Sequence, residues 1–193
     1  MSLLGLDVGI TGCKAVGFNI TGEMLAQAYR EYPLHQPHSG WMELDPVEVW
    51  EAVTDVIRQV TGAIPDDPVR AVSVSTHGES VVPLDAQGRP LYRFITALDT
   101  RAGEQTAWWG EQLGKDRLFQ ITGMPLHPMY TINKLMWLRQ HEPDIFSSAR
   151  RFTCMPDFVF HQLGLDPAMD YSLATRTMAF DVNQLAWSEE ILE

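Results

Sequence analysis

The first 32 residues constrain the fold most, because they contain three short apolar segments separated by tight turns. The segments lie at residues 3–8, 15–19 and 24–32. Each is predicted to be a short strand, with Gly9 ending the first and a turn at residues 19–22 following the second. Short turns join neighbouring strands edge to edge, so the pattern predicts an antiparallel meander at the start of the chain.

Strands and helices alternate after this meander. The segment Asp45-Pro46-Val47-Glu48 is typical of a helix start, with a capping aspartate followed by a proline in the first turn. The apolar stripe that follows at helical spacing contains Trp50, Val53, Ile57 and Val60. Further strands are predicted at residues 69–75, 81–84 and 151–154. Further helices are predicted at residues 100–113, 134–141 (closed by Pro143), 157–163 and, just beginning, 187–193. The chain is therefore expected to have an α/β fold.

Composition excludes several classes of partner. The formal net charge of -11 opposes binding to nucleic-acid phosphates. No apolar run approaches the roughly 18 residues of a membrane span, and the N-terminus lacks the basic region of a signal peptide. Two cysteines are too few for a disulfide framework or a zinc site. We expect a cytoplasmic protein with no nucleic-acid and no membrane partner.

The most informative motif follows the first strand. Gly9 and Gly12 are expected to take positive φ and to let the backbone approach a ligand closely. Successive N–H groups in such a turn can form a concavity that binds anions. Thr11 adds a hydroxyl donor, Lys14 a cation, and Asp7 a carboxylate that suits a hydrated magnesium ion. An ordinary β-hairpin with an acid at its mouth explains the same residues equally well.

Two polar clusters at strand ends are candidate sugar sites. His77, Gly78 and Glu79 interrupt two apolar strands, where an imidazole and a carboxylate can bind several hydroxyls of a polyol. A polar turn accounts for the same three residues. Asp99 lies just before a predicted helix, which it can cap, or it can bind a sugar hydroxyl. Arg101 can pair with an acid or with substrate.

These segments together resemble the FGGY carbohydrate kinases along essentially the whole chain. Residues 7–14 are similar to the family's Asp-x-Gly-Thr-(Thr/Ser)-x-x-(Lys/Arg) phosphate hairpin. Residues 40–46 resemble its Gly-Trp-x-Glu-x-(Asp/Asn)-Pro signature, and residues 99–101 match its Asp-x-Arg. Residues 134–138 match its Lys-(Leu/Ile)-x-Trp-Leu stretch. No single match is decisive, but their order and spacing are specific together.

The resemblance implies a ribonuclease-H-like lobe of the actin-like ATPase fold, with a mixed sheet flanked by helices. It implies ATP and Mg²⁺ as cofactors, and ATP-dependent phosphorylation of a sugar, sugar acid or polyol hydroxyl by the full-length protein. Residues 1–193 are then expected to form the N-terminal lobe, incomplete at its C-terminal end. The second, ATP-binding lobe and the general base are expected beyond residue 193, so the chain alone is predicted to be inactive.

The resemblance also assigns roles to residues. Those expected to bind the phosphates are Gly9, Thr11 and Lys14, with Asp7 holding magnesium through water. Those expected to bind substrate are His77, Gly78, Glu79, Asp99 and Arg101. There are departures from the family pattern. Ile10 replaces the first threonine of the hairpin, which removes one hydroxyl near the phosphates. Residues 76–79 differ from the Gln-Met-His-Gly of xylulose kinases, and Gly78 stands where glycerol kinases have arginine, so a sugar acid or a ketose is left open as substrate. A non-enzymatic sugar-binding or regulatory actin-like module is the alternative, and a homodimer is left open.

Overall fold

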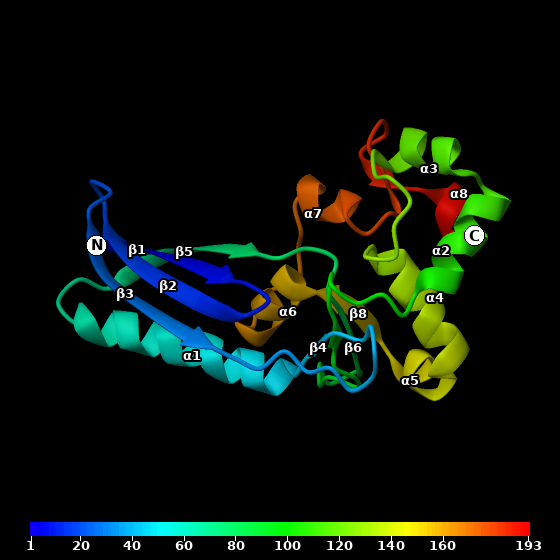
Figure 1. The fold of residues 1–193 in the computed structure, drawn as a ribbon. Coiled ribbons are helices and arrows are strands. Elements are labelled where there is room, and N and C mark those ends of the chain that lie inside the picture. Colours follow the sequence, from blue (N-terminus) through cyan, green and yellow to red (C-terminus); the bar gives the residue numbers. More distant parts are fainter. The chain divides into compact units, whose positions relative to one another are not determined.

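The structure, a computed structural model, describes residues 1–193, which divide into two compact units. Unit 1 comprises Met1–Leu34 and Leu44–His77, and unit 2 comprises His35–Glu43 and Gly78–Glu193. Figure 1 labels the elements of both units. None of the helices combines the length and the apolar composition that crossing a membrane requires.

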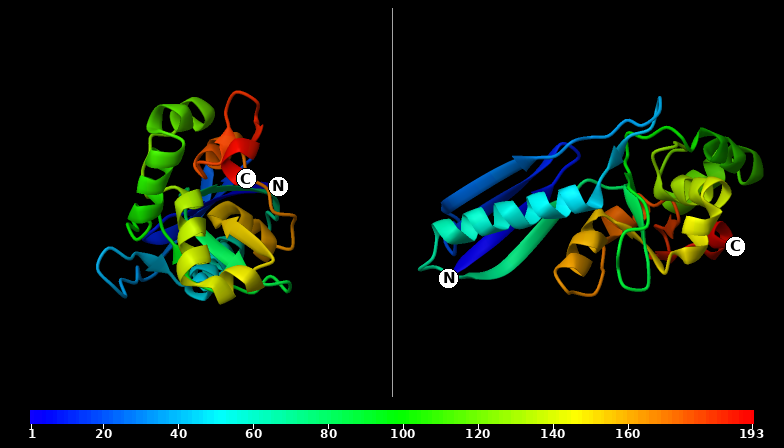
Figure 2. Two further views of the ribbon diagram at one scale, coloured as in Figure 1. Left: turned by 90° about the vertical axis from the view of Figure 1, so that its right-hand side faces the viewer. Right: turned by 90° about the horizontal axis from the view of Figure 1, so that it is seen from below.

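Unit 1 is a four-stranded mixed sheet carrying one long helix. Its strands are β1 (Ser2–Val8), β2 (Gly12–Asn19), β3 (Met24–Glu31) and β5 (Val69–Thr76), in the order β3-β2-β1-β5. The pairs β1–β2 and β2–β3 are antiparallel, which confirms the predicted meander, whereas β5 runs parallel to β1. The connection from β3 to β5 contains α1 (Pro46–Ala63), which lies along the sheet in Figure 1 and, from below, in Figure 2.

The start of α1 was predicted correctly, and its buried face was predicted in part. The Asp45 carboxylate accepts the N–H of Val47 at 2.9 Å, as an N-cap should. Val53 and Val60 of the predicted stripe are buried. Trp50 and Ile57 are only half-buried, at the flanks of the buried face. The residues of α1 that are buried are Pro46, Val49, Ala52, Val53, Val56 and Val60.

Unit 2 is built on a second sheet with several short helices. Its strands are β4 (Glu43–Leu44), β7 (Phe94–Ile95), β6 (Val81–Leu84) and β8 (Arg151–Cys154), in that spatial order. A separate two-stranded sheet pairs β9 (Phe180–Asp181) with β10 (Ala186–Trp187). The helices are α2 (Gly103–Gln112), α3 (Lys115–Thr122), α4 (Thr131–His141), α5 (Pro143–Ser148), α6 (Met155–Gln162), α7 (Tyr171–Thr175) and α8 (Glu189–Leu192).

Several predicted boundaries in unit 2 shift for identifiable reasons. Helix α2 begins at Gly103 rather than at Thr100, because the backbone N–H and hydroxyl of Thr100 both bond to the Gly40 carbonyl. Pro143 does not simply end the preceding helix, since it occupies the first turn of α5, where a missing N–H costs nothing. Trp187 belongs to β10, so the last helix is shorter than predicted.

Candidate functional site

The hairpin between β1 and β2 carries the predicted phosphate residues. Asp7 and Lys14 are directly opposite each other in the antiparallel register, so their side chains lie on the same face, and both are exposed. Thr11 is exposed at the tip of the turn. The Gly9 N–H is not free for a ligand, because it donates to the Gly12 carbonyl at 2.9 Å and closes the hairpin. The donors left at the tip are the N–H groups of Ile10 and Thr11 and the Thr11 hydroxyl.

The expectation of positive φ at Gly9 and Gly12 is wrong, because neither glycine is in the left-handed region. Gly12 is required for a different reason, close packing. A β-carbon added there would lie 2.7 Å from the Arg30 carbonyl oxygen and 2.7 Å from the Tyr29 hydroxyl. The same addition at Gly9 would meet only the Gly12 carbonyl, at 3.2 Å.

Tyr32 supports this hairpin from beneath, a role that the sequence did not reveal. Its ring is buried, and its hydroxyl lies 2.5 Å from the Gly9 carbonyl oxygen and 3.2 Å from that of Gly12. Burial raises the pKa of Tyr32 far above its usual range, so the hydroxyl remains a donor. The turn is therefore held through its carbonyls.

Asp7 fits the requirement for a hydrated magnesium ion. Magnesium keeps several waters and is usually held by one or two carboxylates together with substrate phosphates. The exposed Asp7 carboxylate at a strand end meets this need. A cage made only of protein side chains is absent, because no group of three or more His, Cys, Asp or Glu residues could hold a metal.

His77 ends unit 1, tied to the strand that carries Asp7. Its backbone N–H donates to the Val8 carbonyl at 3.1 Å, and its ring Nδ1 lies 3.1 Å from the same oxygen. The ring is half-buried. A predicted sugar-binding residue is thus fastened to the end of β1.

Glu79 occupies a strained turn at the start of unit 2. The Ser80 N–H donates to the Gly78 carbonyl at 2.8 Å, and Glu79 between them has a φ of 63°. An i to i+2 hydrogen bond around a residue of positive φ defines the classic γ-turn, which is rare and strained. Such strain persists only where surrounding contacts fix the backbone, and it gathers at ligand sites.

The carboxylate of Glu79 is buried and paired with an arginine. The residue is 3% exposed, and its Oε1 forms an ion pair with the Arg176 guanidinium. The Arg176 side chain is itself 40% exposed. It also lies over Gly78, since a β-carbon added at Gly78 would be 3.3 Å from Arg176 Nε. The missing side chain at Gly78 thus leaves room for an arginine that arrives from the end of α7.

The backbone carbonyl of Glu79 is held as firmly as its side chain. The Thr131 hydroxyl donates to it at 3.2 Å and the Lys134 ammonium at 2.8 Å, both from α4. Lys134 is 0% exposed, and burial lowers its pKa to about 7, although Glu79 and Asp99 act in the opposite direction. One helix therefore fixes the turn that carries Glu79.

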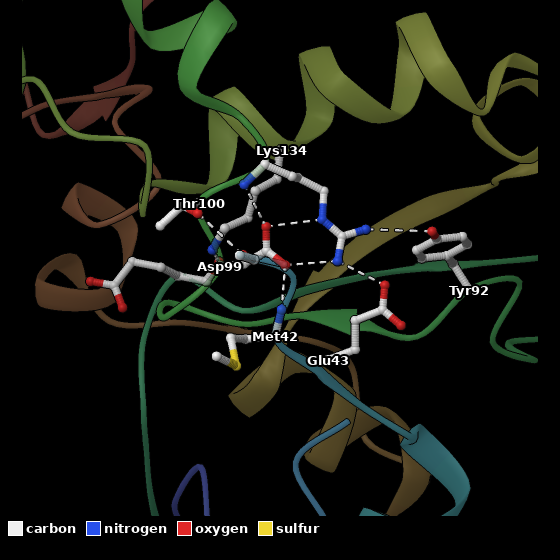
Figure 3. A network of polar contacts seen from close by, with 9 residues as sticks. Met42, Glu43, Tyr92, Asp99, Thr100 and Lys134 are labelled. Carbon is white, nitrogen blue, oxygen red and sulfur yellow. Dashed lines mark hydrogen bonds and ion pairs between the residues drawn. The ribbon is translucent and has the colours of Figure 1, made fainter. Parts of the chain in front are cut away.

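Asp99 and Arg101 belong to a buried ion network, which Figure 3 shows from close by. Arg101 donates through Nε and a terminal nitrogen to the two carboxylate oxygens of Asp99, at 2.9 and 2.7 Å. It also donates to Glu43 at 2.7 Å, and Asp99 accepts the Met42 N–H at 2.7 Å. Burial opposes the charge of Arg101, but the bonds to Asp99 and Glu43 outweigh it and raise the pKa of Arg101.

Aromatic rings complete the enclosure of the Arg101 guanidinium. Its central carbon lies 3.7 Å from the centroid of Trp41 and 4.8 Å from that of Trp137. Tyr92 accepts a further hydrogen bond at 3.4 Å. The network therefore ties the segment around Trp41 to the segment before α2. This arrangement favours structural roles for both residues: Arg101 pairs with an acid, as one of its alternatives expected, and Asp99 binds Arg101 rather than capping α2, whose N-cap residue is Ala102.

The sequence thus predicted Glu79 as a site residue but not the residues that hold its carbonyl and its carboxylate in place. Arg176, Thr131 and Lys134 lie far from it in the chain. The γ-turn itself had no sequence signal, because propensity assigns positive φ to glycine, and here the following glutamate takes it. Of the predicted residues, unit 2 brings Gly78 and Glu79 together with Arg176, and Asp99 together with Arg101.

Comparison with known proteins places these features in context. The model of the N-terminal domain of the FGGY family of carbohydrate kinases matches residues 2–193. Gluconokinase of Bacillus subtilis (strain 168) is 31% identical over 190 residues, covering 98% of this chain and 37% of that protein. Glycerol kinase of Methylibium petroleiphilum is 31% identical over 199 residues, covering 98% of this chain and 40% of that protein.

The solved structures that match this chain are also those of carbohydrate kinases. Gluconate kinase from Lactobacillus acidophilus matches with a TM-score of 0.93 and 30% identity, over 99% of this chain and 39% of that one. A ligand-bound xylulose kinase from the same organism matches with the same TM-score, identity and coverage. These likenesses confirm the actin-like α/β fold. The chain spans 37–40% of the length of these relatives.

Proposed function

This chain belongs to the FGGY family of carbohydrate kinases, and on that premise we propose that the whole protein transfers the γ-phosphoryl group of ATP to a hydroxyl of a sugar, sugar acid or polyol. The observation that carries the proposal is the buried Glu79 carboxylate, held in a strained γ-turn beside Arg176. Residues of this chain would supply the sugar site and part of the phosphate site.

The chemistry of the Glu79 turn suits a hydroxyl-rich ligand. A carboxylate accepts hydrogen bonds and a guanidinium donates them, so the pair can satisfy both functions of a sugar hydroxyl. Glu79 is fixed by its surroundings, while the half-exposed Arg176 is accessible to a ligand. The names of the relatives span gluconate, glycerol and xylulose, so the class of polyhydroxylated carbon compound is supported rather than one member of it.

The hairpin of unit 1 would meet the phosphates. Phosphoryl transfer depends on positioning and on stabilising developing charge rather than on covalent help from the protein. Lys14 would place a cation, and Thr11 a hydroxyl and an N–H, beside the phosphate oxygens. Asp7 would hold magnesium through water, and the bound ion would neutralise charge on the transferring group. Neither Asp7, Thr11 nor Lys14 is committed to the core, because all three side chains are exposed.

We extend the proposal to the division of labour in the whole enzyme. A part of the protein beyond residue 193 would contribute the general base for the attacked hydroxyl, and a second lobe would bind the adenosine part of ATP. Closure of two lobes around the substrates would exclude water and so limit wasteful hydrolysis of ATP. The 193-residue chain would then hold sugar without phosphorylating it.

The test is an ADP-release assay of the whole protein against a panel of neutral sugars, polyols and sugar acids. We expect ADP release that depends on one substrate class, and none above background from the isolated 193-residue chain. A chain that turns over alone would contradict the proposed division between lobes. Sugar binding without any turnover by the whole protein would instead favour a non-enzymatic sugar-binding module, and ATP hydrolysis indifferent to every sugar would overturn the proposal altogether.

A further inference from the structure

Helix α4 contacts the Glu79 turn through two polar side chains that lie one helical turn apart. Thr131 and Lys134 are spaced i, i+3, so they lie on the same face of the helix. Both point their donors at one atom, the Glu79 carbonyl oxygen, at 3.2 and 2.8 Å. A carbonyl oxygen has two lone pairs, so the two bonds satisfy it completely.

Burying Lys134 for this purpose is costly. The residue is 0% exposed, and an ammonium removed from water loses its hydration. Its one hydrogen bond goes to the neutral carbonyl of Glu79, and the carboxylates that attract it, those of Glu79 and Asp99, make no hydrogen bond with it. Methionine or leucine would fill a comparable volume without that penalty. A purely packing role for position 134 is therefore a poor explanation of a lysine there.

Thr131 is oriented by a second buried group. Its hydroxyl oxygen lies 3.9 Å from the Cys154 sulfur. Burial raises the pKa of the Cys154 thiol to about 12, so the thiol keeps its proton and can donate it to Thr131. The Thr131 hydroxyl is then left to donate its own proton to the Glu79 carbonyl. The three residues form a directed chain of hydrogen bonds that ends at the strained turn.

We propose that Thr131 and Lys134 are positioning residues, which hold the γ-turn at Glu79 and so keep its carboxylate aimed at the sugar. This inference rests on the proposed function, because it takes Glu79 to be a sugar ligand. Neither residue needs to touch substrate. Without the two bonds, the positive φ of Glu79 has no contact on its carbonyl to offset its strain, and the turn would relax.

The main test measures Michaelis constants of the whole protein. We expect Thr131→Val, which keeps the shape but loses the hydroxyl, to raise KM for the sugar about fivefold, the equivalent of one lost hydrogen bond. Thr131→Ser should restore it. Lys134→Met should raise KM for the sugar about tenfold, with KM for ATP unchanged in every variant. Leu118→Ala, a fully buried change in α3 without contact to the turn, controls for loss of stability.

A double-mutant cycle asks whether Lys134 acts through Glu79. If it does, Lys134→Met adds little to the sugar KM of a Glu79→Gln enzyme, because the carboxylate that it positions is already gone. Independent, multiplicative effects would overturn the proposal. So would a sugar KM for Leu118→Ala that rises as much as that of Lys134→Met.

A measurement independent of turnover separates this inference from the proposed function. The Ser80 amide closes the γ-turn, so its hydrogen exchange should accelerate in Thr131→Val and Lys134→Met more than in Leu118→Ala. Faster exchange in a protein that phosphorylates no sugar would mean that the positioning is real and the assigned activity is wrong. Unchanged Ser80 exchange in both variants would refute the positioning role, whatever the activity.

Discussion

The two candidate regions of the molecule hold their functional groups by opposite means. In the hairpin of unit 1, the side chains of Asp7, Thr11 and Lys14 are exposed, and support comes from backbone bonds and a tyrosine beneath the turn. In unit 2, Glu79 and Asp99 are 3% and 2% exposed, and both carboxylates are ion-paired. The hairpin therefore carries exposed hydrogen-bond donors, whereas unit 2 holds its carboxylates in buried ion pairs.

This difference suits the two ligands that we propose. A phosphate is recognised by charge and by any N–H that can reach it, so an open backbone surface is sufficient. Hydroxyls differ only in position, and discriminating among them needs polar groups whose geometry is fixed. Substitutions of the residues that hold Glu79 should therefore disturb stability together with sugar binding, while side-chain changes at the hairpin tip should act on nucleotide binding alone.

The largest effect should come from Arg101→Met. Removing the guanidinium leaves Asp99 and Glu43 buried without their cation, and breaking such a buried pair typically costs about 3–5 kcal/mol of unfolding free energy. Urea denaturation monitored by tryptophan fluorescence would measure the loss. Arg117→Met is the matched control, because its pair with Glu190 is exposed and should be nearly neutral. Equal midpoints for the two variants would show that the network does not hold unit 2 together.

Gly12→Ala should lower stability although it lies in the hairpin, because Gly12 is closely packed whereas the residues at the hairpin tip are exposed. The added methyl would collide with the Arg30 carbonyl, so we expect a loss of about 1–3 kcal/mol in unfolding free energy. Gly62→Ala, in α1 with nothing within 4 Å of the new β-carbon, should instead be neutral or stabilising. Denaturation midpoints of the two variants check this, and a Gly12→Ala chain as stable as Gly62→Ala would contradict the packing argument.

The pH dependence of stability should report on Lys134. Its pKa of about 7 in the folded chain lies below the usual 10.5, so between these values the unfolded chain binds more protons. The unfolding free energy should therefore rise with pH from about 7 toward 10, by at most about 1.4 kcal/mol per pH unit from this group. Lys134→Met should lack that slope. Parallel curves for the two proteins, measured by urea denaturation at several pH values, would contradict the lowered pKa.

The smallest effect is expected at the hairpin tip. Ile10→Thr adds a hydroxyl where the family pattern carries one, and Ile10 is only half-buried, so the change should not disturb the core. One added hydrogen bond to phosphate should lower KM for ATP about threefold, with the sugar KM unchanged. A change in the sugar KM of similar size would show that the two regions are not separable in this way.

The features that depend on neighbouring residues in the chain could be predicted from the sequence. The meander and the capped start of α1 depend on neighbouring residues, and both are confirmed by the strand register and by the Asp45 hydrogen bonds. The hairpin tip was located for the same reason. Its φ values were not, because a Gly9–Gly12 backbone bond closes the turn without left-handed residues.

Long-range chemistry accounts for what the sequence did not predict. The residues that hold Glu79 come from α4 and from the end of α7, and no spacing rule connects them to it. The sequence left helix capping and sugar binding open for Asp99, and its buried bonds to Arg101 and Met42 favour a third, structural role. Which polar residue at a strand end faces a ligand, and which faces another side chain, is decided by tertiary packing.

The most direct test of the account compares Glu79→Gln with Lys14→Met in the whole protein, with Michaelis constants measured for both substrates. We predict that Glu79→Gln raises KM for the sugar by about tenfold or more and leaves KM for ATP unchanged, because a hydrogen bond to a charged group is lost in one region only. Lys14→Met should do the reverse. A Glu79→Gln enzyme with an unaltered sugar KM, or with both constants raised together, would contradict the claim that the buried turn in unit 2 binds the sugar while the hairpin binds the phosphates.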